Sequence, residues 1–82
     1  METIWIGRLV GTFCGYGRGR VYKLSDDSVW VQEDATDEPG YLDGADVRLM
    51  TRRGSGIIHL LVEGATARVR VSLVETRMRT AG

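Results

Sequence analysis

Three stretches of this chain can each fold back on themselves in a single register. In each one, apolar residues at alternate positions meet apolar partners directly opposite, and opposite residues in an antiparallel pair share a face. The second and third stretches share the strand around Leu60, and both assign Ile58 and Leu60 to the same side. The agreement predicts a β-meander. The stretches are residues 21–32, 47–60 and 58–71, with two-residue turns at Asp26–Asp27, Arg53–Gly54 and Gly64–Ala65.

The same registers predict which side chains form the core. A slip of one residue would turn the apolar set outward and bring arginines inward, at a large desolvation cost. The predicted opposite pairs are Tyr22 and Val31, Leu24 and Val29, Val47 and Leu60, Leu49 and Ile58, Val62 and Ala67, Leu60 and Val69, and Ile58 and Val71. The predicted core is Tyr22, Leu24, Val29, Val31, Val47, Leu49, Ile58, Leu60, Val62, Val69, Val71 and Leu73.

Length and composition indicate one small domain. The chain has 82 residues, of which 43% are hydrophobic, with one cysteine and one histidine. We expect a domain over residues 1–76 and a disordered tail over 77–82. The longest apolar run is far shorter than the roughly 20 residues of a membrane span. With no basic and apolar leader at the N-terminus and no cysteine pair, a cytoplasmic, reducing location is expected.

Apolar residues alternate with a period of two along most of the chain, which predicts strands rather than helices. Strands are expected at 5–13, 20–25, 28–34, 46–51, 56–63 and 66–74, with the longest connection at 35–45. Five or six short strands in so small a chain favour a curled sheet over a sandwich of two broad sheets. The expected fold is all-β, a small five- to six-stranded antiparallel SH3-like barrel, with an OB-like barrel as the alternative.

The first hairpin carries a compact motif: an aromatic residue, any residue, Leu, a turn, then Val-Trp-x-Gln. Here it runs from Tyr22-Lys23-Leu24 to Val29-Trp30-Val31-Gln32. This resembles small uncharacterised bacterial SH3-like β-barrel proteins, including orphan proteins of integron gene cassettes. The resemblance implies a small β-barrel and brings no activity or site with it. The chain departs from the motif at Asp27, where the pattern has glycine, so the turn type is open.

The hairpin registers place a mixed apolar and basic set on the outer side of the meander. A solvated sheet face is normally polar, so large apolar groups among arginines resemble an interface with an acidic or phosphate-bearing partner. The alternative is that the first strand, the long loop or the tail covers this side. The candidate interface residues are Arg48, Met50, Ile57, His59, Leu61, Arg68 and Arg70.

Trp30 falls on the outer side of its strand in the predicted register. Together with Tyr16 and Tyr41 it could line an aromatic groove for a base or a peptide. The alternative is a tryptophan packed under a loop, as expected where few large residues are available for a core.

The sequence contains no recognisable pattern for a phosphate-binding loop, a calcium loop or a catalytic site. The run Gly15–Arg20 fails both glycine-rich phosphate fingerprints and lies between antiparallel strands. The acids Asp37, Glu38, Asp43 and Asp46 match no calcium loop and are expected to be a solvated loop. Cys14 has only His59 as a potential base, so we expect no catalytic residues, no metal and no cofactor. A composite site in an oligomer is the remaining catalytic alternative.

These observations favour a non-enzymatic binding or adaptor module that acts as a homo-oligomer. Self-association is expected through the outer face or through edge pairing of the strand that ends at Val74. A protein or peptide partner is also possible, and no membrane partner is expected. The alternative is single-stranded nucleic-acid binding through Arg48, Arg68, Arg70 and Trp30. The formal net charge of zero weighs against it.

Overall fold

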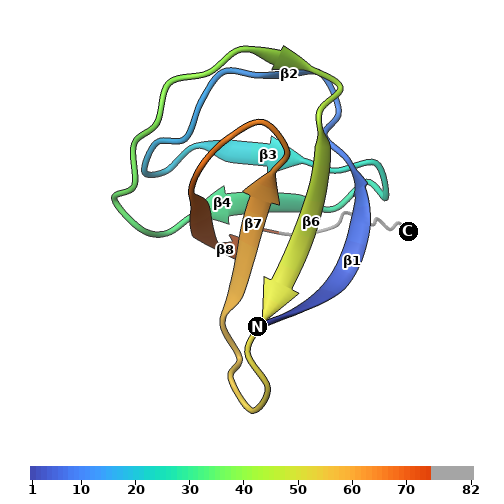
Figure 1. The fold of residues 1–82 in the computed structure, drawn as a ribbon, viewed down its shortest axis with the longest axis vertical. Helices are drawn as coiled ribbons and strands as arrows, with labels where there is room; N and C mark the ends of the chain where they lie inside the picture. Colours follow the sequence, from blue (N-terminus) through green and yellow to red (C-terminus); the bar gives the residue numbers. More distant parts are fainter. Residues whose placement is uncertain (75–82) are drawn as a thin grey trace, which may run out of the picture.

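The computed structural model describes residues 1–74, which form eight strands and no helix. Six strands join in one antiparallel sheet with the order β1-β6-β7-β8-β4-β3, and β2 pairs with β5 alone (Figure 1). The prediction of an all-β antiparallel domain is confirmed for this range. The expected tail at 77–82 and the domain end at residue 76 lie outside it. The strands are β1 (Glu2–Arg8), β2 (Thr12–Phe13), β3 (Val21–Lys23), β4 (Val29–Gln32), β5 (Leu42–Asp43), β6 (Asp46–Thr51), β7 (Ile58–Val62) and β8 (Arg68–Leu73).

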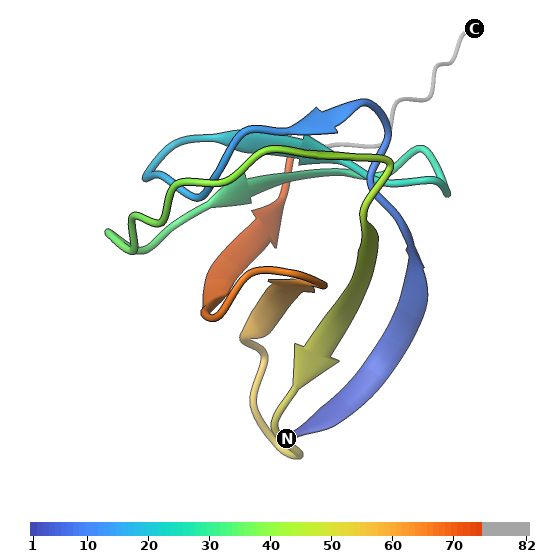
Figure 2. The ribbon, with the colours of Figure 1, turned by 45° about the horizontal axis from the view of Figure 1, so that its top comes forward.

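The sheet curls strongly, so that β3 and β4 run crosswise to β6 and β7 (Figures 1 and 2). Its two edge strands meet at one point, where Leu9 and Leu24 form an isolated bridge. The Val10 N–H donates to the Lys23 carbonyl oxygen there at 2.8 Å. No described strand pairs with the rest of the outer edge of β1. The sheet is therefore not a closed barrel, and of the expected small barrel the structure shows a strongly curled antiparallel sheet.

The β7–β8 hairpin has the predicted register. Leu60 lies opposite Val69, and Ile58 lies opposite Val71. Gly64 adopts a φ of 103° in the turn, a conformation that L side chains rarely take. The β6–β7 hairpin keeps its predicted faces but is shifted by two residues, so that Leu49 meets Leu60 instead of Ile58. A wider loop after Thr51 replaces the expected two-residue turn, and a shift of two preserves the alternation.

The β3–β4 hairpin differs from the prediction by one residue. Tyr22 lies opposite Trp30, not Val31. The loop has three residues rather than two, because the Leu24 N–H donates to the Ser28 carbonyl oxygen while Asp27 takes a φ of 71°. A three-residue loop that ends in a left-handed residue is a standard hairpin connection. Here aspartate takes the place that the resembled motif gives to glycine.

This slip exchanges the two faces of β4. Trp30 and Gln32 turn inward, whereas Val29 and Val31 are half-buried on the outer side. The indole N–H of Trp30 donates to Ser28 Oγ at 2.8 Å, so the buried ring keeps a polar partner. The prediction of Val29 and Val31 as core residues is therefore wrong. The apolar alternation could not reveal this, because Val-Trp-Val is apolar at every position.

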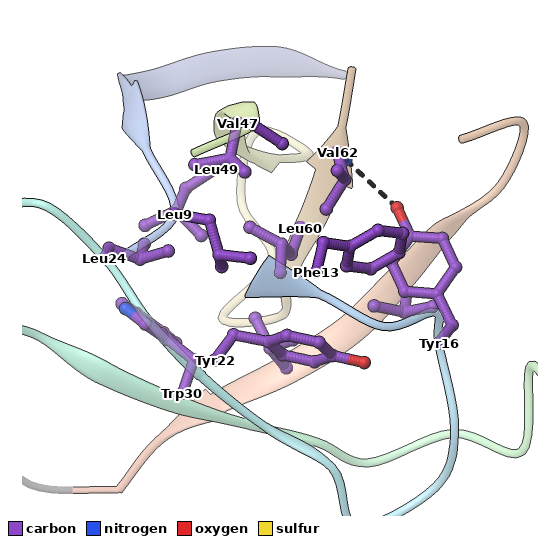
Figure 3. Packing of buried hydrophobic residues seen from close by; sticks show 13 residues of the cluster. Leu9, Phe13, Tyr16, Tyr22, Leu24, Trp30, Val47, Leu49, Leu60 and Val62 are labelled. Carbon is purple, nitrogen blue, oxygen red and sulfur yellow. Dashed lines mark hydrogen bonds between the residues drawn. The ribbon is translucent and has the colours of Figure 1, made fainter. Parts of the chain in front are cut away.

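The core otherwise follows the meander registers (Figure 3). Ile58 is partly buried against it, whereas Leu73, the last residue of β8, is 51% exposed although it lies opposite Trp30. The prediction of Leu73 as a core residue is thus wrong. Of the predicted set, the buried members are Tyr22, Leu24, Val47, Leu49, Leu60, Val62, Val69 and Val71.

A second part of the core comes from segments outside the three predicted hairpins. Phe13 on β2 turns inward and meets Tyr16 edge-on, with ring centroids 5.2 Å apart. Leu9 and Ala45 are also buried. These residues fill the end of the curled sheet that β2 and β5 cover, so the short two-stranded ladder closes the core there (Figure 2).

Gln32 ties three segments together from inside the fold. Its Oε1 accepts hydrogen bonds from the Gly17 N–H at 3.0 Å and the Tyr22 hydroxyl at 2.8 Å. Its Nε2 donates to the Thr36 carbonyl oxygen at 2.6 Å and to Asp34 Oδ1 at 3.0 Å. Both lone pairs and both N–H bonds of the amide are used, as a buried amide requires. The glutamine of the Trp-x-Gln motif is therefore structural.

The Tyr16 hydroxyl bridges the two sides of the β7–β8 hairpin next to its turn. It accepts a hydrogen bond from the Val62 N–H at 3.0 Å and donates to the Ala67 carbonyl oxygen at 2.8 Å. Val62 and Ala67 are the pair predicted to lie opposite each other, and this hydroxyl joins them. The Glu38 carboxylate accepts the N–H groups of Thr66 and Ala67, and these bonds lower the pKa of Glu38. The long loop is thus fastened to the meander.

Candidate functional site

The outer side of β6, β7 and β8 carries six of the seven predicted interface residues. Alternation along each strand places them on one face, which we call the basic–apolar face, and Ile57 directly precedes β7 on the same side. Ladder pairing puts Arg48 opposite Leu61 and Leu61 opposite Arg68 in one row. The next row holds Met50, His59 and Arg70. Basic and apolar side chains therefore alternate across the sheet.

One side chain that the sequence argument missed extends this face. Ile6 on β1 lies opposite Arg48 and is 68% exposed. Ile4, Trp5 and Ile6 are apolar at consecutive positions, so alternation alone could not say which of them points outward. With Ile6, the row that contains Leu61 has an apolar residue at its open end.

The two halves of the face differ in charge. On the β1–β6 half, Arg48 Nε lies 3.3 Å from a carboxylate oxygen of Glu63, and Arg8 Nε lies 3.3 Å from one of Asp46. On the β8 half, neither Arg68 nor Arg70 forms an ion pair with any residue in the described range. The arginines of the first half are therefore paired and those of the second are not, and the carboxylates of Glu33 and Asp34 border the second half.

His59 sits at the centre of the face and is half-buried. Its Nδ1 is buried and has no hydrogen-bond partner within residues 1–74. Burial lowers the pKa of His59, and the nearby Arg68, Arg70 and Arg52 lower it further, while Asp34 acts in the opposite direction. The imidazole is consequently neutral at neutral pH, in a positively charged surrounding.

Two hollows flank the face. One, of about 370 Å³, lies beside Ile6 on the β1–β6 half, between the two ion pairs. The other, of about 300 Å³, lies beside Arg70 and Ile57, with Ser72 and Glu33 in its wall. The Glu33 carboxylate accepts a hydrogen bond from the Ser72 hydroxyl, so this acid is engaged with β8.

The predicted aromatic groove does not form. Trp30 is 8% exposed and Tyr16 is buried, whereas Tyr41 is 74% exposed on the long loop. Both buried rings use their polar atoms within the fold, as described above. This corrects the expectation, and the physical reason is the three-residue loop that turned Trp30 inward.

Three of the four acidic residues considered for a cation site have structural partners. Glu38 holds the β7–β8 turn, Asp46 pairs with Arg8, and Asp43 Oδ1 accepts a hydrogen bond from Thr12 Oγ1 at 2.6 Å. Across residues 1–74 no three acidic, histidine or cysteine side chains gather in a way that could hold a metal ion. Gly15 comes so close to the Glu38 carbonyl oxygen that an added Cβ would lie 2.6 Å from it. The glycine-rich segment is therefore packed against the long loop.

The strand that ends at Val74 is not an edge. β8 lies between β7 and β4, so its backbone groups are already paired on both sides. The expected edge-to-edge association through this strand is therefore wrong. The long outer edge of the sheet belongs to β1.

Comparisons of the chain with protein-family models, with curated proteins and with solved structures find no match. In the part of the chain that the structure describes, no helix is long and apolar enough to cross a membrane. What this protein does must therefore be argued from the basic–apolar face itself.

Proposed function

We propose that the protein is a non-enzymatic binding module, built as a small, incompletely closed SH3-like barrel, that forms a homo-oligomer through the β1–β6 half of the basic–apolar face together with Leu61 on β7. An OB-like barrel is the alternative description of the same curled sheet. The single cysteine fits a reducing compartment such as the cytoplasm.

The observation that carries the proposal is the outward-facing apolar set on this half of the face. Ile6 is among the most exposed large apolar side chains, and Met50 on β6 and Leu61 on the adjoining β7 are half-buried on the same outer side. Exposed apolar groups rimmed by polar residues are typical of protein interfaces. Because Arg8 and Arg48 have carboxylate partners, two copies can meet here without like charges opposing each other.

Light scattering coupled to size-exclusion chromatography tests this proposal. The unmodified protein at tens of micromolar is expected to elute as an oligomer, and Ile6→Glu and Leu61→Glu are expected to shift it to a monomer that keeps its β-sheet circular dichroism. Val21→Glu is the matched control, since Val21 is 55% exposed on the outer side of β3, across the sheet from this half. A monomeric unmodified protein would contradict self-association, and dissociation by Val21→Glu would move the interface elsewhere.

Nucleic-acid binding is the second candidate, and the unpaired charges of Arg68 and Arg70 favour it. Two of the four side chains first assigned to it support it less, because Trp30 is buried and Arg48 is paired with Glu63. Binding of a labelled single-stranded oligonucleotide at two salt concentrations tests it. Affinity that falls with salt and is lost in Arg68→Glu/Arg70→Glu would support it, and no binding at low salt would eliminate it.

A further inference from the structure

We propose that the β8 half of the basic–apolar face is a binding site for a phosphoryl group, held by Arg68 and Arg70 beside His59, with Arg52 at its border. This site adjoins the proposed oligomer contact, because Leu61 lies opposite Arg68, but it uses neither Leu61 nor Ile6. The inference therefore does not depend on self-association.

The spacing of the two arginines suits one oxyanion. Arg68 and Arg70 are two positions apart on one strand, so their Cα atoms lie roughly 6.6 Å apart on the same side of the sheet. His59 lies directly opposite Arg70, and Leu61 lies opposite Arg68. Two guanidinium groups at successive outward positions of one strand can converge on a single tetrahedral anion, with the imidazole beside Arg70. The planar fork of arginine donates two parallel hydrogen bonds to such an oxyanion.

The charge of this half calls for an external partner. Arg68 and Arg70 have no ion pair within the described range, and Arg52 is close enough to His59 to lower its pKa together with them. Like charges gathered on one surface repel each other, and a multivalent anion removes that repulsion. A doubly charged phosphoryl group meets this need better than a single carboxylate.

His59 supplies an independent observation. Its Nδ1 is the buried side-chain nitrogen that lacks a partner in residues 1–74, and an unmade hydrogen bond of this kind is unfavourable. An anion between the arginines would favour uptake of a proton by the imidazole, and the ring nitrogen Nε2, which is not buried, could then donate to the anion. The neutral imidazole and the unpaired arginines beside it thus point to the same missing ligand chemistry.

Two carboxylates limit the site on the β4 side. Asp34 Oδ2 accepts the backbone N–H of Arg70 at 3.0 Å, and Glu33 accepts the Ser72 hydroxyl. Both acids are therefore held by β8 rather than by the arginine side chains. The hollow of about 300 Å³ between Ile57 and Arg70 leaves room for the group that carries the phosphoryl.

Proton NMR of the imidazole tests the inference, because His59 is the only histidine in the sequence. Titration with inorganic pyrophosphate, at an ionic strength held constant with sodium chloride, is expected to shift the imidazole C–H signals saturably. The pKa of His59 is expected to rise when pyrophosphate is bound, because a nearby anion favours the protonated ring. No saturable shift, or an unchanged pKa at saturation, would overturn the inference.

Charge-removing variants locate the site. Arg68→Gln/Arg70→Gln is expected to weaken pyrophosphate binding at least tenfold, whereas Arg53→Gln, on the exposed β6–β7 loop, is the matched control and should change it less than twofold. Glu33→Gln is expected to strengthen binding, because it removes an acid from the wall of the hollow. Equal binding by the unmodified protein and the double variant would overturn the inference.

A labelled single-stranded oligonucleotide distinguishes the source of the phosphoryl group. Displacement of the oligonucleotide by pyrophosphate supports one site that reads phosphates of a nucleic-acid backbone. Saturable pyrophosphate binding without oligonucleotide binding supports a small phosphorylated ligand. Oligonucleotide binding that persists in Arg68→Gln/Arg70→Gln places the phosphate contacts elsewhere and counts against the site. Ile6→Glu should leave pyrophosphate binding unchanged, which separates this outcome from the oligomer test.

Discussion

Gln32 on β4 and His59 on β7 are polar side chains on inner strands of the same sheet, and they differ in how far the chain satisfies their hydrogen-bonding groups. Gln32 faces the core and has every donor and acceptor of its amide occupied by the chain itself. His59 faces outward, and its buried Nδ1 has no partner within residues 1–74. The surroundings of Gln32 mix donors and acceptors, whereas those of His59 are dominated by arginines.

This difference distinguishes polar groups that hold the fold together from polar groups that are available to a ligand. Polar groups that the fold needs are satisfied within it, because an open hydrogen bond in the core is costly. His59 is half-buried without a hydrogen-bond partner for its Nδ1, and the arginines beside it have no ion pairs within residues 1–74. We expect that the stability of the fold does not require this cluster. Substitutions and pH changes test this distinction, from the largest expected change in stability to the smallest.

The largest effect is expected from Gln32→Leu. The substitution keeps the volume but leaves the Gly17 N–H, the Tyr22 hydroxyl and the Thr36 carbonyl oxygen without their partner. We expect the free energy of unfolding to fall by about 2–5 kcal/mol, measured by urea denaturation. A loss below about 1 kcal/mol would show that water or neighbouring groups replace the amide, and the contrast with His59 would fail.

Alkaline pH should loosen the same network. Burial raises the pKa of Tyr22 to about 12 and also raises that of Tyr16. Because the folded state keeps a proton that the unfolded chain releases near pH 10, stability is full below pH 10 and falls as the pH rises toward 12. We expect a loss of roughly 2 kcal/mol at pH 12 from Tyr22. Urea midpoints measured at several pH values check it, and Tyr22→Phe should flatten the dependence.

Tyr16→Phe should have a smaller effect. It removes the hydroxyl that joins the Val62 N–H to the Ala67 carbonyl oxygen, at a cost of about 1–3 kcal/mol. Tyr41→Phe is the matched control, since that ring is exposed on the long loop and its change should stay within about 0.5 kcal/mol. Equal urea midpoints for the two variants would show that the hydroxyl bridge contributes nothing.

The smallest effect is expected from His59→Leu. Replacing a half-buried ring that has an unpartnered nitrogen should change the free energy of unfolding by less than about 1 kcal/mol at pH 7.5. The pKa of His59 is lowered in the folded state, so the unfolded chain binds the proton more tightly. The unmodified protein should therefore lose stability as the pH falls below about 6.5, and the variant should lose less. A loss of several kcal/mol at pH 7.5 would make His59 architectural.

The hairpins show how far a sequence argument reaches. The β7–β8 register was predictable because the inward positions from Ile58 to Val71 are all apolar around a glycine turn, while the outward positions are polar except for Leu61 and Ala65. The β3–β4 register was not, because Val29, Trp30 and Val31 are all apolar and the turn residue Asp27 does not reveal its φ. The choice between a two- and a three-residue loop decided the face of Trp30, and with it the fate of the predicted groove.

The basic–apolar face was predictable for a related reason. A register shift of two at β6–β7 leaves every residue on its predicted side, so the error in pairing did not disturb the face. What the sequence could not supply was the division of that face into two halves. The partners of Arg48 and Arg8 lie on strand ends beyond the alternating pattern, and Ile6 belongs to a strand that is apolar on both sides.

The pairing of β1 with β6 has a consequence for the order in which the chain folds. β6, β7 and β8 follow one another and pair with their neighbours in sequence, so the meander needs only short loops to close. β1 finds its partner across the whole segment that contains β2 to β5, and this closure costs more chain entropy before any contact offsets it. We therefore expect the C-terminal meander to form the folding nucleus and the N-terminal strand to dock late. Newly made chains would then expose the free edge of β6 until that docking is complete.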